Sequence, residues 1–68
     1  MSIREVLGRN LRLKRQELSL SQEELASRAK VDRTYISAIE RGVYGVTIDI
    51  LDRIATGLGV EASDLLKR

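Results

Sequence analysis

Two short helices joined by a tight turn are predicted for residues 21–42, SQEELASRAKVDRTYISAIERG. Ser21 can cap the first helix, and Glu24 three residues later completes the signature of a capping box. Asp32 is placed to cap the second helix, and Gly42 stands where a left-handed residue would end it. Only about three residues link the two helices, and so short a link favours the sharp crossing called a helix-turn-helix.

The rest of the chain also has helical periodicity, and no alternating run typical of a strand is present. We expect a first helix over residues 2–17, a fourth over 47–58 and a short fifth over 62–66. The apolar residues expected to face the core are Ile3, Leu7, Leu11, Leu18, Leu25, Ala26, Ala29, Ile36, Ile39, Ile48, Leu51, Ile54, Ala55 and Leu58. The prediction is one all-α domain, 1–68, folded as a compact five-helix bundle.

The amino-acid composition argues against several classes of protein. The 68 residues include neither cysteine nor histidine. Disulfides and thiolate metal sites are therefore excluded, and the commonest general base and metal ligand are missing. No catalytic set or phosphate loop is recognisable either, so we expect neither an enzyme nor a bound cofactor or metal. No apolar run approaches the roughly 20 residues of a membrane span, and the first residues do not resemble a secretory signal, which predicts a cytoplasmic protein.

Charge is unevenly distributed along the chain. Residues 1–42 hold nine Lys and Arg against six Asp and Glu, whereas residues 43–66 hold one basic residue against four acidic ones. The first part is therefore the better suited to a polyanion such as nucleic acid, although the net charge of the whole chain is only +2.

The outward face of the second short helix could contact bases. Arg33, Thr34, Ser37 and Ala38 lie toward its N-terminal half, and none of them is acidic. Arginine can pair with guanine through two hydrogen bonds, threonine can bond a base, and alanine can pack on a thymine methyl group. Gln22 could brace such contacts or bind phosphate. From this pattern alone, an ordinary solvated helix face stays open as the alternative.

Residues 21–26 and 32–42, with Leu7-Gly8-Arg9 upstream and Leu58-Gly59-Val60 downstream, resemble the phage lambda repressor and Cro family of helix-turn-helix proteins. The resemblance covers nearly the whole chain. It implies a transcription regulator that binds a palindromic double-stranded DNA operator as a homodimer, with the second helix of the motif in the major groove. Within that family, the chain is similar to controller proteins of restriction–modification systems. The resemblance does not decide between an activator and a repressor. No small-molecule effector is expected, because no ligand-binding domain is recognisable.

The family's DNA contacts carry over to particular residues of this chain. The base-proximal positions implied by the resemblance are Gln22, Arg33, Thr34, Ser37 and Ala38. Arg41 and the loop around Tyr44 would lie on phosphates. Tyr35 could reach a phosphate or cover the edge of the core, and the sequence does not decide between the two. The chain departs from the family by Lys30 at a usually glycine turn position and by Tyr44-Gly45-Val46 in a loop that usually holds a proline.

Two further sets of residues follow from helical position. Glu40 lies beside the apolar stripe of its helix and needs a basic partner; position allows Lys14 or Arg15, and the resemblance selects Arg15. Four apolar residues at the end of the chain either simply complete the core or share that role with a dimer contact: Val60, Ala62, Leu65 and Leu66. We expect the shared role, with Leu65 facing inward and Val60, Ala62 and Leu66 contributing to a dimer contact. The alternative function is an antitoxin-type protein-interaction module that also binds DNA, for which we would expect an additional toxin-binding segment after Leu66.

Overall fold

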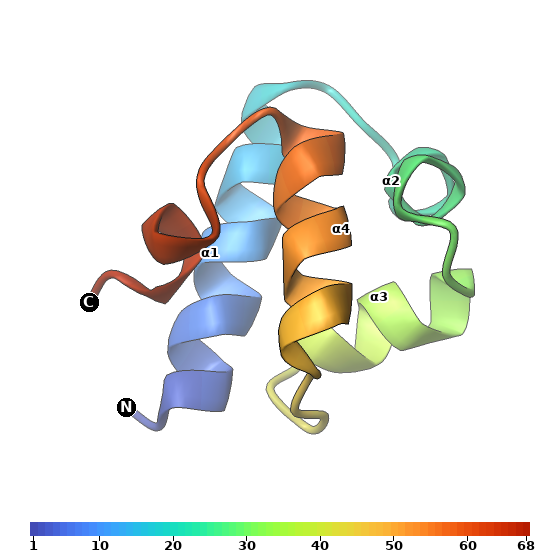
Figure 1. Ribbon diagram of the computed structural model, residues 1–68. Coiled ribbons are helices and arrows are strands. Elements are labelled where there is room, and N and C mark those ends of the chain that lie inside the picture. The colour runs from blue at the N-terminus through green and yellow to red at the C-terminus, as the bar shows by residue number, and fades with distance from the viewer.

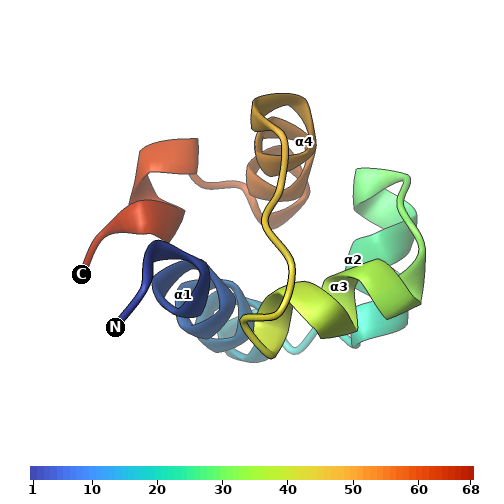
Figure 2. The same cartoon turned by 90° about the horizontal axis from the view of Figure 1, so that it is seen from below.

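The computed structural model describes residues 1–68 as four α-helices and a terminal 3-10 helix, without a strand. The elements are α1 (Ile3–Glu17), α2 (Gln22–Ala29), α3 (Arg33–Glu40), α4 (Ile48–Leu58) and the 3-10 helix η1 (Ala62–Leu66). α3 packs against α1 and α2, while α4 packs against α2 and η1. In Figure 1, α3 crosses the lower end of the molecule and α2 is seen end-on beside it. The view from below shows the loop that runs from α3 to α4 across this end (Figure 2).

The helix ends follow the predicted capping residues. Ser21 Oγ accepts a hydrogen bond from Glu24 N at 2.9 Å, and the Glu24 carboxylate accepts one from Ser21 N at 2.8 Å. These bonds lower the pKa of Glu24, because the Ser21 N–H, and after it the hydroxyl, favours the charged carboxylate. Thr47 caps α4 through its hydroxyl, and Gly42 and Gly59 adopt left-handed conformations with φ of 75° and 71°. The predicted helix boundaries are therefore confirmed.

Asp32 precedes α3 as predicted, but its side chain makes no capping bond. The first turn of α3 is closed by the backbone, since Tyr35 N donates to the Asp32 carbonyl oxygen at 3.0 Å. The fifth helix is confirmed in position and is a 3-10 helix.

Most of the predicted core is confirmed, with three errors and three omissions. The buried apolar side chains are Val6, Leu7, Leu11, Leu20, Leu25, Ala26, Ala29, Ile36, Ala38, Ile39, Leu51, Ile54, Ala55, Leu58 and Leu65. Ile3, Leu18 and Ile48 were predicted to face inward and are exposed instead, Ile48 by 84%. They stand at helix ends, where no neighbouring element covers them. Val6, Leu20 and Ala38, by contrast, are buried and were not among the residues expected to face the core.

Gly8 sets the close approach of α1 to α3. A Cβ atom at this position would stand 2.8 Å from the carbonyl oxygen of Glu40 and closer still to that of Ile39. Only glycine therefore lets the first helix lie against the C-terminal end of α3 at this distance. None of the helices has the length and apolar character needed to cross a membrane.

Candidate nucleic-acid interface

The turn between α2 and α3 is held by a side chain from α4. Arg53 donates from Nε to the Ala29 carbonyl oxygen at 2.9 Å and from Nη2 to the Lys30 carbonyl oxygen. In the opposite direction, Arg28 Nη1 donates to the Gly57 carbonyl oxygen at 3.1 Å. Lys30 adopts the left-handed conformation, with φ 58° and ψ 48°, as its place in the turn suggested. α4 thus holds the crossing of α2 and α3 in place, because it donates hydrogen bonds to the end of α2 and the turn and accepts one from α2.

An ion pair connects α1 to the C-terminal end of α3. Arg15 Nε lies 2.6 Å from Glu40 Oε2, and Arg15 Nη2 lies 3.0 Å from Glu40 Oε1. A third bond runs from Arg15 Nη1 to the Leu20 carbonyl oxygen at 2.9 Å. The side chains are only 13% and 5% exposed, and the hydrogen bond to Glu40 raises the pKa of Arg15. The expected pair is therefore present, and Lys14 instead pairs with Glu17.

Gln22 is tied into this ion pair. Its Nε2 donates to Glu40 Oε1 at 3.1 Å, and the residue is half-buried at the start of α2. The sequence placed Gln22 at the base-proximal surface, but its amide nitrogen is turned toward α3. The bond couples the first turn of α2 to the last residue of α3.

The N-terminal end of α3 presents free polar side chains. Arg33 and Thr34 are exposed, and Ser37 is half-buried. Arg33 lines one side of a groove whose other side is the first turns of α2, with Ser21, Gln22 and Ser27. The three ion pairs of the chain do not involve Arg33. Its guanidinium is therefore available to a ligand, and the N-terminus of α2, which favours anions, borders the same groove.

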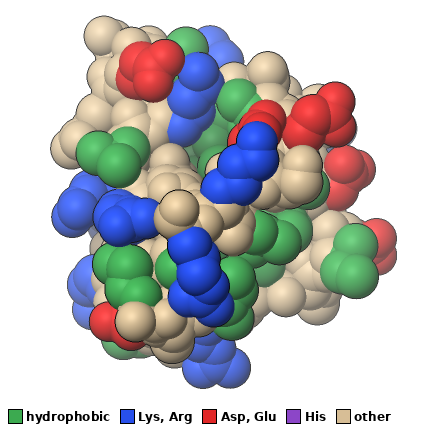
Figure 3. Space-filling model, turned by 90° about the vertical axis from the view of Figure 1, so that its left-hand side faces the viewer, with side chains coloured by type: hydrophobic (Ala, Val, Ile, Leu, Met, Phe, Trp, Pro, Cys, Tyr) green, Lys and Arg blue, Asp and Glu red, His purple; other side chains and the backbone are tan.

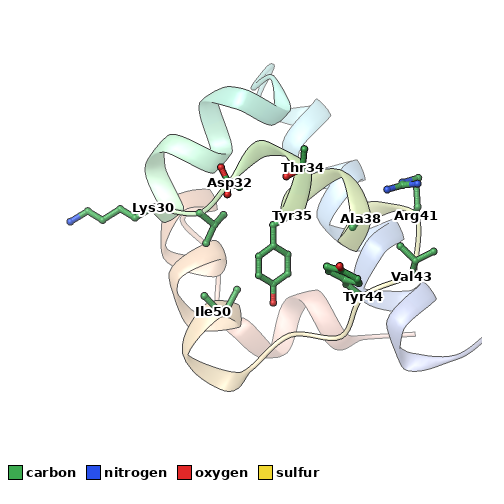
Figure 4. A pocket seen from close by; sticks show the side chains of 10 residues that line it. Lys30, Asp32, Thr34, Tyr35, Ala38, Arg41, Val43, Tyr44 and Ile50 are labelled. Atoms are coloured by element: carbon green, nitrogen blue, oxygen red, sulfur yellow. The ribbon is translucent and has the colours of Figure 1, made fainter.

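The other side of α3 is covered by aromatic rings. Tyr35 and Tyr44 meet edge to face, with ring centroids 5.7 Å apart and planes at 86°. Figure 4 shows both rings in the hollow between α3 and the following loop, with Ile50 across from them. Tyr35 is partly buried against the core, and its hydroxyl donates to the Gly45 carbonyl oxygen at 3.5 Å. Of its two possible roles, the structure thus shows packing at the core edge, while Tyr44 stays exposed.

Ala38 is placed differently from the sequence expectation. Only 6% of the residue is exposed, and it lines the same hollow as the two tyrosines. An alanine at the base-proximal surface would have its methyl group open to solvent. Ala38 lies on the flank of α3 that the loop approaches and is less exposed than the helical pattern predicted.

A cluster of three arginines lies at the C-terminal end of α3. Arg41 is exposed, and its Nε donates to the Ser37 carbonyl oxygen at 3.3 Å. It shares a depression with Arg9 and Arg12 of α1, together with Glu5. Arg9 Nε is buried and has no hydrogen-bond partner in the chain. Sequence reasoning identified only Arg41, although the three-residue spacing of Arg9 and Arg12 on one helix would have indicated the other two.

The residues assigned to a dimer contact differ in their exposure. Val60 and Ala62 are half-buried and pack against the core, whereas Leu66 is exposed. Sequence reasoning also missed the clamp made by Arg53, because nothing in a helical pattern marks a side chain that will bond to carbonyl groups of another helix.

Comparison with known proteins agrees with this geometry. The sequence pattern of the helix-turn-helix family (HTH_3) matches residues 11–65. Control protein C.BamHI of Bacillus amyloliquefaciens is 41% identical over 66 residues, which cover 96% of this chain and 82% of that protein. A hypothetical transcription factor of Neisseria meningitidis is 44% identical over 64 residues, which cover 94% of this chain and 60% of that protein. The chain thus spans less than two thirds of the length of this Neisseria relative.

Comparison with a solved structure shows that the fold is similar as well. The restriction–modification controller protein C.AhdI of Aeromonas hydrophila superposes with a TM-score of 0.89 at 35% sequence identity, covering 91% of this chain and 94% of that one. Sequence and structure agree along nearly the whole of residues 1–68. The chain therefore belongs to the helix-turn-helix family of DNA-binding transcription regulators.

Proposed function

We propose that two copies of this chain bind one palindromic duplex DNA operator, with α3 of each copy in the major groove. The observation that carries this proposal is Arg33, exposed and unpaired in the first turn of a helix that α2 and α4 hold in a fixed orientation. The half-sites would be about 10 base pairs apart, so that both helices reach the same side of the duplex.

Different residues of α3 would serve different functions. Arg33 is eight residues from Arg41, which is about 12 Å along a helix. Because the major groove is about 12 Å wide, both ends of α3 cannot reach base edges when the helix enters by its N-terminus. We assign base reading to Arg33, Thr34 and Ser37. We assign phosphate binding to Arg41, together with Arg9 and Arg12, which line the same depression.

The remaining predicted contacts receive narrower roles. Tyr44 is exposed on the loop after α3 and is suited to a phosphate. Gln22 acts as a positioning residue, because its amide is held by Glu40. Tyr35 supports the loop through its ring and hydroxyl. The protein would act in the cytoplasm by binding alone, without catalysis, cofactor or small-molecule effector.

The relatives suggest a more specific role. The control protein C.BamHI is 41% identical over most of its length, and the controller protein C.AhdI shares the fold. We infer that this chain regulates genes of a restriction–modification system. Selection of bound DNA from a random pool, followed by a search for the consensus upstream of such genes, tests the role. A consensus found only beside unrelated genes would contradict the role in restriction–modification. A protein that co-purifies with this chain in stoichiometric amount would instead favour an antitoxin.

The DNA-binding arrangement is tested by Arg33→Ala and Arg41→Ala, with Lys14→Ala as a control. Lys14 lies on α1, where it pairs with Glu17, and its replacement removes the same single positive charge. Arg33→Ala should weaken consensus binding by about 1–3 kcal/mol and relax the preference at one position of each half-site. Arg41→Ala should weaken binding to all sequences alike and lower the salt slope by about one per subunit.

The measurement is affinity for the consensus and for its single-base variants across a salt series. Lys14→Ala should leave both base preference and slope nearly unchanged. If Arg33→Ala lowers affinity equally for every variant, Arg33 is a phosphate contact and the proposed orientation of α3 is wrong.

A further inference from the structure

The depression between α1 and the C-terminal end of α3, which we call the Arg9 site, is lined by three arginines. Arg9 and Arg12 belong to α1, and Arg41 directly follows α3. None of the three takes part in an ion pair within the chain. Arg12 and Arg41 are exposed and Arg9 is half-buried. Three cations without a charged partner therefore line a space that solvent can enter.

Charge alone does not distinguish the Arg9 site from the rest of the surface. The face that contains both chain termini also carries Lys and Arg groups, scattered among apolar and acidic ones (Figure 3). The distinguishing feature is Arg9 Nε, which is the only buried side-chain nitrogen or oxygen atom without a hydrogen-bond partner in the chain. A buried donor without a partner is costly, and a bound ion is one explanation for such a group.

Two acidic residues also line the site, but their carboxylates are bound to other groups. Glu40 accepts hydrogen bonds from Arg15 and Gln22. Glu5 Oε1 accepts a hydrogen bond from Ser2 N at 2.9 Å. Neither carboxylate forms an ion pair with an arginine of the site. The guanidinium groups are therefore free to bind an anion from solution.

The dimensions of the site fit a small ligand. Its volume is about 210 Å³, below the roughly 300–1,000 Å³ of pockets that hold drug-sized molecules. Gly42 forms part of the wall, and a Cβ atom there would lie 3.2 Å from Glu5 Cγ. A side chain at this position would narrow the space between α1 and the end of α3. The site thus fits one compact anion rather than a whole nucleotide.

The donors of the site favour a phosphate group among compact anions. A guanidinium presents its N–H groups as a planar fork that matches two oxygens of a phosphate, and such charge-assisted bonds are about twice as strong as neutral ones. The tetrahedral oxygens of a phosphate can accept from arginines on different elements at once. A carboxylate offers two oxygens in a single plane, and so it serves fewer of the three arginines.

We infer that the Arg9 site binds one phosphate group, which joins α1 to the end of α3. A turn of the Arg9 side chain toward the depression would give Nε the acceptor that it lacks in the chain. The source of the group is a free phosphate ion or a phosphodiester of bound DNA, and the two tests that follow distinguish these sources. Free phosphate would be a second ligand beside the DNA of the proposed function. Only the DNA source rests on that function.

The first test uses the protein without DNA. Inorganic phosphate replaces chloride at constant ionic strength, and binding is measured by the unfolding temperature and by the arginine Nε–H signals in NMR spectra. We expect saturable stabilisation and a shift of the Arg9 signal. Arg12→Gln should raise the Kd for phosphate about tenfold, because it removes one charge-assisted hydrogen bond.

Arg4→Gln is the matched control for this measurement. Arg4 is also an exposed arginine of α1 without an ion pair, but it lines a different groove. Phosphate stabilises folded proteins in general because it is excluded from their surface, and this effect is common to all variants. Arg4→Gln should therefore keep the wild-type Kd. If Arg4→Gln and Arg12→Gln weaken phosphate binding equally, binding is not localised and the assignment is wrong.

Arg9→Met separates phosphate binding from a structural role of Arg9. The variant removes the unpaired donor, so in chloride it should unfold at the wild-type temperature or higher, and the saturable effect of phosphate should disappear. A lower unfolding temperature in chloride together with undiminished phosphate binding would show that Arg9 is structural, which overturns the inference. If Arg9→Met does not fold, the exposed Arg12 and its variant decide the question.

The second test asks whether bound DNA uses the same site. In a duplex with one half-site, each phosphate is replaced in turn by an uncharged methylphosphonate. One replacement should weaken wild-type binding about tenfold and weaken Arg12→Gln clearly less, because that variant has already lost part of the contact. Inorganic phosphate should also compete with the half-site for the wild type more strongly than chloride does at equal ionic strength.

The combined results assign the source. Saturable stabilisation without a methylphosphonate effect assigns the site to free phosphate, and the opposite pattern assigns it to DNA. If neither measurement distinguishes the wild type from Arg12→Gln, the Arg9 site binds no phosphate, while base reading by Arg33 is judged by its own variant. If the wild type shows no sequence-specific DNA binding, the proposed function fails, and the first test still decides on free phosphate.

Discussion

The ion pair between Arg15 and Glu40 should be far more sensitive to loss of one partner than to loss of both. The Glu40 carboxylate accepts three hydrogen bonds, two from Arg15 and one from Gln22. Replacing Glu40 by leucine leaves the Arg15 guanidinium, only 13% exposed, with the Leu20 carbonyl oxygen as its remaining partner. The double variant Arg15→Met with Glu40→Leu leaves no charge behind.

The expected magnitudes differ accordingly. Breaking a buried pair by removing one partner costs about 3–5 kcal/mol. Because some water reaches Arg15, we expect the lower end, about 3 kcal/mol, for Glu40→Leu and a similar value for Arg15→Met. The double variant should lose about 1 kcal/mol or less, since replacing such a pair by apolar groups is often neutral. A chain of 68 residues has a total stability of roughly 3–10 kcal/mol, so either single variant loses about a third or more of it.

Urea denaturation followed by circular dichroism measures this cycle. A stabilising osmolyte present at equal concentration in all four samples keeps the single variants folded at zero denaturant. The coupling energy, which is the sum of the two single losses minus the loss of the double variant, should be about 5 kcal/mol. If the double variant loses the sum of the two single losses, the pair contributes nothing as a pair and the argument from its burial is wrong.

Three further perturbations have defined outcomes. Lys30→Gly should raise the free energy of unfolding by about 0.5–1 kcal/mol, because Lys30 has φ 58°; a loss would show that the turn is not strained. Gly8→Ala should lower it by about 2–3 kcal/mol, because the new Cβ meets two backbone oxygens; a neutral result in the same assay would contradict the close approach of α1 and α3. The lowered pKa of Glu24 stabilises the fold above the ordinary value of 4.5, and this contribution is lost as pH falls through the folded-state value. Glu24→Gln should therefore flatten the fall in urea midpoint below about pH 5; an unchanged acid slope would show that the capping box is not the cause.

Much of the fold could be predicted because its helix ends are encoded locally. Ser21 with Glu24, Thr47, Gly42 and Gly59 act on their own neighbours along the chain, so the sequence suffices to place them. The two-helix motif followed from these signals and from the shortness of its turn. Arg33 in the first turn of α3 followed as well, since it lies outside the apolar stripe of that helix, and it is exposed.

Only the tertiary structure decided which side chains at the edges of the helices are covered by a neighbouring element and which are exposed. Periodicity placed Ile48 on an inward stripe and Ala38 on an outward face, yet the first is exposed and the second is buried. A helical wheel gives the direction of a side chain but not the neighbour that it meets. Ile48, the first residue of α4, is not covered by any other element, whereas Ala38 is buried in the hollow beside the loop that follows α3. Gln22 turned toward Glu40 for the same reason: the partner lies 18 residues away, and only packing of α2 against α3 brings it within hydrogen-bonding distance.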